Sequence, residues 1–281
     1  MRPALSVLLS VLHFSLLACS PASPPPAPTD IRAHSAASLP SGPGDAAWAL
    51  AAEFTAPLLP QDMVEPRALE RTTPHVRVRA VCDGRRVAFR LEWPDSTRND
   101  EQRPGAFSDA CAVQFPSQVQ ADLPAPQMGE LGKDVEILFW RATWQAALSS
   151  SGPALAQLYP NASIDHYPFQ ARSESADMAA RYSPARAVEN DLALPRSTPV
   201  EVLVASGPGT LRPGARDSEA SGAGVRTDAG WSVVLARPLP RGFEGFGRTQ
   251  VAFAVWDGAH GEVGARKMRT VWIPFAMEVQ P

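Results

Sequence analysis

A methionine in a short loop is the first residue of this sequence whose setting suggests chemistry. Met128 lies in the stretch PAPQMGELGK, between Pro126 and Gly129 and just after a predicted strand. Rigid backbone on either side would hold its side chain in one orientation, so the soft thioether sulfur could be pointed at a partner. The open alternative is that Met128 is an apolar cover over the core, which is the commoner role of a loop methionine.

Other groups that could do chemistry are scattered. The sequence has no nucleophile elbow, phosphate-binding loop or dinucleotide fingerprint. His13 and His34 lie near the N-terminus, and His75, His166 and His260 lack the spacing that puts two metal ligands on one helix face. Aspartate and glutamate residues fall mainly at turns and on polar strand faces, where solvation explains them. Hydrolase chemistry is therefore poorly supported.

The cysteines exclude some sites and leave one pairing open. After Cys19 only Cys82 and Cys111 remain, each on the apolar face of a predicted strand. In an oxidising compartment these two could form a disulfide, and two buried free thiols are the alternative. Without CxxC or CxxCH spacing they exclude covalent c-type haem attachment and a cysteine-only zinc or iron–sulfur site.

Short alternating segments must position these residues. HVRVRAVCDGRRVAFRLEWPD predicts an antiparallel hairpin that turns at Asp83-Gly84. Further strands are predicted at DACAVQFP, DVEILFWRATW, PVEVLVASG, GWSVVLARPL, TQVAFAVWDG and TVWIPFAMEV, and GAGVRTDAG is expected to be a hairpin loop. Short helices are expected at residues 45–54 and 176–190, and a long irregular excursion at 145–175. The predicted fold is all-β: an antiparallel β-sandwich with a few short helices.

The N-terminal residues predict export. Residues 4–18 are an apolar run too short to span a membrane, and Leu16-Leu17-Ala18-Cys19 resembles a bacterial lipobox, in which Cys19 is lipidated. An ordinary secretory signal is the alternative. Residues 1–19 are thus a predicted lipoprotein-type signal peptide, residues 20–44 a Pro/Ala/Ser-rich tether, and residues 45–281 the folded domain. The net charge is −3 and the sequence has no basic block, so nothing suggests a nucleic-acid partner and none is expected.

The ordered set of segments resembles one family across nearly the whole chain from Asp45 to Ala276. DAAW, VRVRAVCDGRRVAFRLEWPDST, DACAVQFP, PQMGE, IDHYP, GWSVVLARPL, VAFAVWDG and VWIPFAM follow one another in that order. This is similar to the haem-binding γ subunits of type II dimethyl-sulfoxide-reductase enzymes, such as ethylbenzene dehydrogenase and dimethyl sulfide dehydrogenase. The resemblance implies a β-sandwich with one non-covalent haem b. It implies a non-catalytic subunit that relays electrons between an iron–sulfur β subunit, beside a molybdenum α subunit, and an external carrier such as a c-type cytochrome.

The same resemblance implies that Met128 and Lys267 are the axial ligands of the haem iron. Of 26 basic residues only Lys133 and Lys267 are lysines. A neutral lysine amine offers a lone pair, which a guanidinium practically never does, although chance could also place a lysine at position 267. Met268, His260 and His166 are competing ligands. Met268 should not reach the same iron as Lys267, because successive residues of an extended segment point to opposite faces.

The lipobox departs from the family pattern, whose members are soluble periplasmic proteins. It predicts a chain exported to the periplasmic side and anchored to a membrane by lipid at Cys19. Two hypotheses compete with this function: a carbohydrate-binding β-sandwich without a cofactor, and a lipid-anchored structural or assembly protein without a cofactor. A carbohydrate-binding module would use exposed aromatic side chains as a platform, drawn from Trp48, Trp93, Trp140, Trp144, Trp231, Trp256 and Trp272. Most of these lie on the apolar face of a predicted strand, which favours the core.

Overall fold

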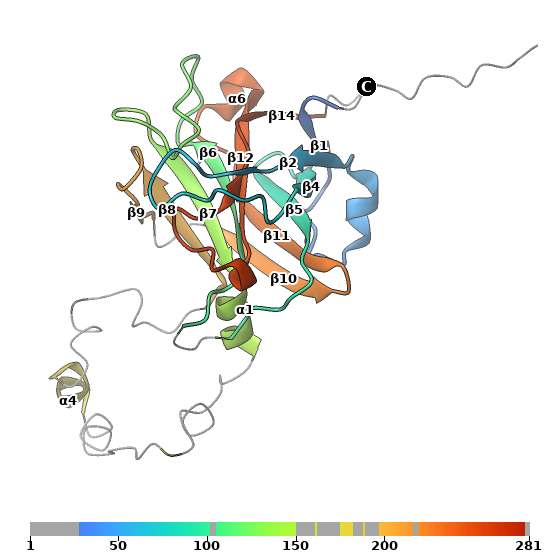
Figure 1. Cartoon of the computed structure of the whole chain (residues 1–281). Coiled ribbons are helices and arrows are strands. Elements are labelled where there is room, and N and C mark those ends of the chain that lie inside the picture. Colours follow the sequence, from blue (N-terminus) through green and yellow to red (C-terminus); the bar gives the residue numbers. More distant parts are fainter. Residues whose placement is uncertain are drawn as a thin grey trace, which may run out of the picture.

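A computed structural model describes residues 28–101, 105–149, 161, 175–181, 188, 197–215 and 219–278. Its strands join into one sheet that folds over on itself, in the order β10-β11-β5-β4-β1-β14-β12-β6-β7-β8-β9. Figure 1 shows β4, β5, β10 and β11 on one side of β12 and β14, with β7, β8 and β9 on the other. The path comprises β1 (Ile31–Ser35), β4 (His75–Cys82), β5 (Arg86–Pro94), β6 (Ala110–Pro116), β7 (Val135–Arg141), β8 (Val200–Ala205), β9 (Arg212–Pro213), β10 (Ser221–Thr227), β11 (Gly230–Pro238), β12 (Arg248–Trp256) and β14 (Ile273–Met277).

Aromatic side chains bind the two halves of the folded sheet together. Phe89 of β5 has its ring centroid 5.6 Å from that of Phe115 on β6, 5.9 Å from Phe253 on β12 and 5.3 Å from Phe275 on β14. All four are fully buried in the main core cluster. Because the rings come from both halves, the molecule is the β-sandwich that the alternating pattern predicts.

The predicted hairpin is confirmed, and so are the six strands predicted after it. β4 and β5 pair antiparallel with Cys82 opposite Val87, and Gly84 turns between them with φ +90°. The strand predicted at DVEILFWRATW is shorter than expected. This strand, β7, ends at Arg141, and the last three residues of the predicted segment begin helix α1 (Ala142–Ser149).

Several short strands escape the sequence pattern. β2 (Phe54–Pro57) pairs with β4, and β3 (Leu59–Pro60) pairs with β13 (Met268–Arg269). The expected hairpin loop GAGVRTDAG is mostly β10, paired antiparallel with β11. Gly224 is needed there because a Cβ would lie 2.3 Å from the Trp140 ring.

The predicted tether is corrected at its C-terminal end. Residues Ile31–Ser35 form β1, which pairs parallel with β14 on one side and β4 on the other. Ile31 and Ala33 belong to the main core. Two apolar residues in a Pro/Ala/Ser-rich stretch give too little periodicity to predict a strand, so the described folded domain begins before Asp45.

The helices are short. The segment predicted as a helix at residues 45–54 is a 3-10 helix, η1 (Ala46–Leu50), capped by the Asp45 carboxylate. The one predicted at residues 176–190 is α4 (Ala176–Arg181), with most of the remainder outside the described residues. The turns α6 (Phe243–Phe246) and η3 (Gly258–His260) flank β12. The long excursion lies largely outside the described residues, and none of the described helices is long and apolar enough to cross a membrane.

The cysteine pairing is wrong in this structure, where Cys82 and Cys111 are both buried free thiols. Cys82 lies opposite Val87, at the start of β5. Cys111 lies near the other end of β5. It is two residues from Asp109, whose carboxylate approaches that of Asp95, the residue that follows β5. β5 has nine residues, and at about 3.3 Å per residue its ends are about 26 Å apart. A disulfide requires Cα atoms within about 7 Å, so these two strand positions cannot be bridged.

Candidate functional site

The Met128 loop connects β6 to β7 and is held in a single conformation. Met128 has φ +68°, and it is the only non-glycine residue with positive φ among those described. Gly129 follows with φ +82°, and a Cβ there would lie 2.8 Å from the Lys133 carbonyl oxygen. A left-handed conformation costs a non-glycine residue on the order of 1 kcal/mol, so surrounding contacts must enforce it.

Three hydrogen bonds supply that enforcement. The Gln114 side-chain amide of β6 donates to the Pro126 carbonyl at 3.0 Å, and the Trp272 indole, just before β14, donates to the Pro124 carbonyl at 2.8 Å. The Gly207 backbone amide, just after β8, donates to the Met128 carbonyl at 2.9 Å. The backbone of the loop is therefore held at three places, by one strand and by two connections next to strands.

Lys267 lies directly opposite that methionine. It precedes β13, whose Met268 pairs with Val255 of β12. The Lys267 Nζ is 3.9 Å from the Met128 Sδ and 5.1 Å from the centroid of the Trp256 ring. A soft sulfur, a lysine amine that donates to it, and an aromatic face thus meet at one point.

An apolar surface surrounds the pair on the outer face of the sheet. We call it the outer apolar face; its buried members are Ala110, Ala112, Val135, Ile137, Ala205 and Trp256. Met128, Phe139 and Trp272 are half-buried against it. The alternate residues of β6 point the other way into the main core, so β6 is apolar on both faces. A strand apolar on both faces is expected where something covers each face.

Burial lowers the pKa of the Lys267 amine to about 8, and the nearby positive charge of Arg269 adds to the effect. The ordinary value is about 10.4, so the fold favours the neutral amine by roughly two pKa units, or about 3 kcal/mol. The residue is partly exposed to solvent, and screening reduces that figure. The fold thereby offsets most of the free energy needed to deprotonate this lysine near neutral pH.

The two side chains arrive from opposite ends of the sheet. The Met128 loop follows the C-terminal end of β6, at Pro116. Lys267 follows the C-terminal end of β12, where Trp256 pairs with Ala110 at the start of β6. Antiparallel neighbours end at opposite edges, so the loops can meet only by lying over the outer apolar face.

The competing ligands are not brought to this point. Met268 is fully buried in the main core, on the opposite side of its strand from Lys267, as the alternation predicts. His260 pairs with Asp257 at 2.8 Å, and His166 lies outside the described residues. Lys133 forms ion pairs with Asp122 and Glu130. Among the described residues, Lys267 is the amine that faces the methionine sulfur.

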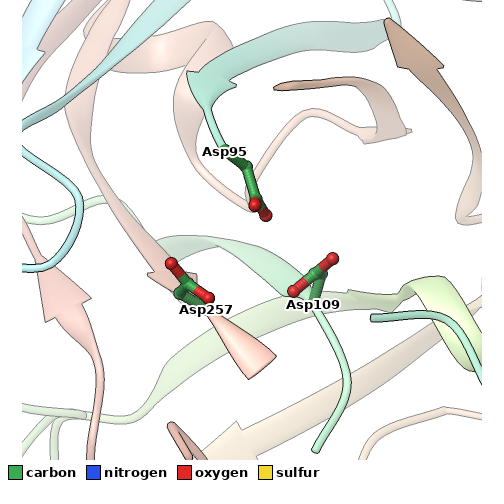
Figure 2. Close-up of side chains that lie close together, drawn as sticks. All are labelled: Asp95, Asp109 and Asp257. Carbon is green, nitrogen blue, oxygen red and sulfur yellow. The ribbon is translucent and has the colours of Figure 1, made fainter. Parts of the chain in front are cut away.

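A second cluster, of aspartates, was missed by the sequence analysis. Asp95, Asp109 and Asp257 offer carboxylate oxygens that lie within 4.8 Å of one another, and Figure 2 shows the three side chains converging. Their exposures are 6%, 0% and 7%, so solvation does not explain them. Burial raises the pKa of Asp109 to about 6. The sequence does contain a signal, because each aspartate adjoins the end of a strongly predicted strand. β6 pairs with β12, and the facing half of the sheet brings the end of β5 to the same place.

The tryptophans do not form an exposed platform. Trp48, Trp93, Trp140, Trp231 and Trp256 are buried, and Trp144 and Trp272 are half-buried. Trp272 donates its indole N–H to the Met128 loop. The carbohydrate-binding hypothesis depended on exposed aromatic faces and is not supported by the described residues.

Comparison with known proteins gives two matches. A family model described as ethylbenzene dehydrogenase matches residues 45–268, a span that includes Met128, Lys267 and all three aspartates. A protein of Haloferax mediterranei named "Putative respiratory nitrate reductase heme subunit ORF7" is 24% identical over 281 residues, which covers 96% of this chain and 79% of the relative.

Proposed function

The chain belongs to the ethylbenzene dehydrogenase family, and from this premise we propose that it is the haem-binding, electron-transferring subunit of a molybdenum oxidoreductase complex. The observation that carries the proposal is the 3.9 Å approach of the Lys267 amine to the Met128 sulfur. The relative from Haloferax mediterranei, named as a heme subunit, supports the same cofactor. The proposed subunit holds one non-covalent haem b and does not itself transform a substrate.

The two donor atoms suit a haem iron by their chemistry. The Met128 sulfur and the Lys267 nitrogen face each other at 3.9 Å, and these are the two residues that would hold the iron. Both donors are neutral when the amine has lost its proton, and the fold already lowers its pKa to about 8. The outer apolar face supplies the apolar wall that a porphyrin requires.

The residues of the site would have separate tasks. A bound haem would supply one-electron chemistry through its iron. Lys267 would give the nitrogen lone pair, and Met128 would give a soft sulfur, which raises the reduction potential. Trp256 covers the amine and its indole donates to the Gly264 carbonyl at 3.1 Å, which fastens the segment before Lys267. The three hydrogen bonds that hold the Met128 loop keep the loop in the position from which the sulfur faces the Lys267 amine.

The family and the heme-subunit relative support association with a molybdoenzyme. We propose that the partners are an iron–sulfur β subunit and a molybdenum α subunit. In this arrangement the haem passes electrons between the iron–sulfur clusters and an external carrier such as a c-type cytochrome.

The test is the visible spectrum of the purified protein beside that of Met128→Leu. The wild type is expected to show a low-spin haem b spectrum with sharp α and β bands on reduction. Leucine keeps the approximate volume but removes the sulfur, so the variant is expected to become high-spin and to have a lower reduction potential. Met277→Leu is the control, because Met277 of β14 contacts Cys82 of β4 and is not part of the Met128–Lys267 site. A wild type without a Soret band contradicts the function, and an unchanged Met128→Leu spectrum contradicts only the ligand.

We also propose that the chain is exported to the periplasmic side and held at a membrane by lipid on Cys19, a residue outside the described part of the chain. The support is the lipobox-like sequence before it. Cys19→Ser is expected to move the protein from the membrane to the soluble fraction, while Ser23→Ala leaves it in place. Intact mass should show the acyl groups on the wild type. A wild type without acyl mass would end this proposal and leave the haem site untouched.

A further inference from the structure

The three aspartates of Figure 2 come from three connections at the same edge of the sandwich. Asp95 follows β5, Asp109 precedes β6, and Asp257 follows β12. β6 lies beside β12, and β5 belongs to the facing half of the sheet. The cluster therefore joins the two halves where the Trp93, Trp140 and Trp231 rings also meet.

Most of the carboxylate oxygens have structural partners. Asp109 accepts bonds from the Gly258 and Asn99 amides and from the Trp231 indole, each at 2.9 Å. One oxygen of Asp257 accepts from the Ala259 amide, and the other pairs with His260. Oδ1 of Asp95 accepts from the Thr97 amide and hydroxyl.

The remaining oxygen points to a ligand. Oδ2 of Asp95 is buried and has no hydrogen-bond partner in the described part of the chain, and the side chain is directed at the other two carboxylates. A buried carboxylate oxygen without a partner costs at least as much as a lost hydrogen bond, and two neighbouring carboxylates raise that cost. Something positive at the point of convergence would offset it.

Positive groups of the protein do not meet that need. Nη2 of Arg226 donates at 2.7 Å to the main-chain carbonyl of Asp95, and its buried Nη1 has no hydrogen-bond partner among the described residues, so the guanidinium does not satisfy Oδ2 of Asp95. His260 has a half-exposed side chain and pairs with Asp257, not with Asp95 or Asp109. Glu262 adds a fourth buried carboxyl next to the cluster, since its Oε2 accepts from the Asp257 amide at 2.8 Å. The described residues around this point thus carry a surplus of buried negative charge.

We propose that Asp95, Asp109 and Asp257 bind a divalent cation of the calcium type. The donors are oxygens only, which selects hard cations over the transition metals that prefer nitrogen and sulfur. Calcium accepts mono- and bidentate carboxylates in irregular geometry, whereas magnesium demands a near-octahedral shell. A cation here ties the ends of β5, β6 and β12 together. This site is separate from the haem site and does not depend on the proposed haem function.

The rival explanation is a shared proton. Two carboxylates in contact can hold one proton between them instead of a metal, and the raised pKa of Asp109 is compatible with that state. The two explanations differ in what stabilises the protein. A cation site responds to calcium at constant pH, and a shared proton responds to acid alone.

The experiment uses the full chain with its cofactors as purified, after treatment with a chelator. Calcium at about 100 times its dissociation constant is expected to raise the thermal midpoint by about 5–10 °C, followed by circular dichroism. Magnesium at the same concentration should give a much smaller shift. Isothermal titration calorimetry should show one calcium per chain.

Asp95→Asn tests the ligand set, because it keeps the size of the side chain and removes the charge of the unpartnered oxygen. The variant is expected to lose the calcium shift and to be more stable than the wild type without calcium, since a repulsion is removed. Asp122→Asn makes the same charge change on a side chain that is 80% exposed, and it should keep the shift. A wild type that neither binds calcium nor gains stability from it, and that gains stability on mild acidification, overturns the proposal in favour of the shared proton.

Discussion

Lys267→Arg is expected to abolish the low-spin haem spectrum while the chain stays folded. Arginine keeps the positive charge and most of the length, but its guanidinium has no usable lone pair near neutral pH. Loss of a supporting residue around a metal commonly weakens binding by about 10–100-fold, and loss of a direct ligand should cost at least as much. The measurement is haem content and spin state by visible spectroscopy, together with circular dichroism to show that the fold is retained.

The same lysine predicts a pH dependence whose sign follows from its lowered pKa. Ligation needs the neutral amine, and the free amine has a pKa of about 8. Below that pH each unit of acidification should weaken ligation by about tenfold, because one proton competes for the lone pair. Above it the affinity should no longer change. A spectrophotometric titration is expected to show loss of the low-spin form on the acid side.

Lys133→Arg is the matched control, since the other lysine of the chain is paired with Asp122 and Glu130. It should change neither the spectrum nor the titration. If Lys267→Arg keeps an unchanged low-spin spectrum, the ligand assignment is wrong. His260 and His166 would then be the next residues to substitute.

Phe89→Ala is expected to destabilise the folded protein by about 3–5 kcal/mol, the usual cost of emptying a buried aromatic position. Phe89 is 1% exposed and is the one ring that contacts Phe115, Phe253 and Phe275 together. Its removal takes out the one ring that links β5 to β6, β12 and β14 together, and leaves the Trp93–Trp140 contact as a remaining aromatic link between β5 and the other half. Chemical denaturation should show a lower midpoint for this variant at an unchanged slope.

The control for this loss is Phe246→Ala in the turn α6. That side chain is 52% exposed, so its truncation should change the free energy of unfolding by about 0.5 kcal/mol or less. A Phe89→Ala midpoint as close to the wild type as that of Phe246→Ala would mean that the two halves are held together elsewhere.

Much of the fold follows from alternation in the sequence. The hairpin of β4 and β5 has one strongly apolar face and an Asp-Gly turn, and the strands from β6 onwards are rich in valine and phenylalanine. β1 has only two apolar residues, Ile31 and Ala33, and β10 has glycines where neighbouring side chains approach closely. Gly224, against the Trp140 ring, is an example. Such strands are set by tertiary packing, which a local pattern does not contain.

The two sites also differ in how far the sequence predicts them. Met128 and Lys267 were found only through a family resemblance, because 139 positions separate them and nothing local relates a loop methionine to a distant lysine. The aspartate cluster depends on which strand ends meet. Asp95 and Asp257 resemble ordinary turn residues until β5 and β12 are placed in their halves of the sheet. The pairing order places Asp109 and Asp257 at one edge, because β6 lies beside β12, and the packing of the two halves then brings Asp95 of the facing half to them.

The parallel insertion of β1 has a consequence for the order of folding events. β1 lies between β14 and β4, and His34 contacts Glu278 across 244 positions at 2.9 Å. A contact of such sequence separation forms late, because the loop it closes must first be ordered by nearer contacts. During synthesis, β4 and its hairpin partner would exist long before β14 emerges from the ribosome. β1, β2 and β4 can already pair with one another at that stage, so the parallel pairing of β1 with β14 is the contact that completes the sheet last.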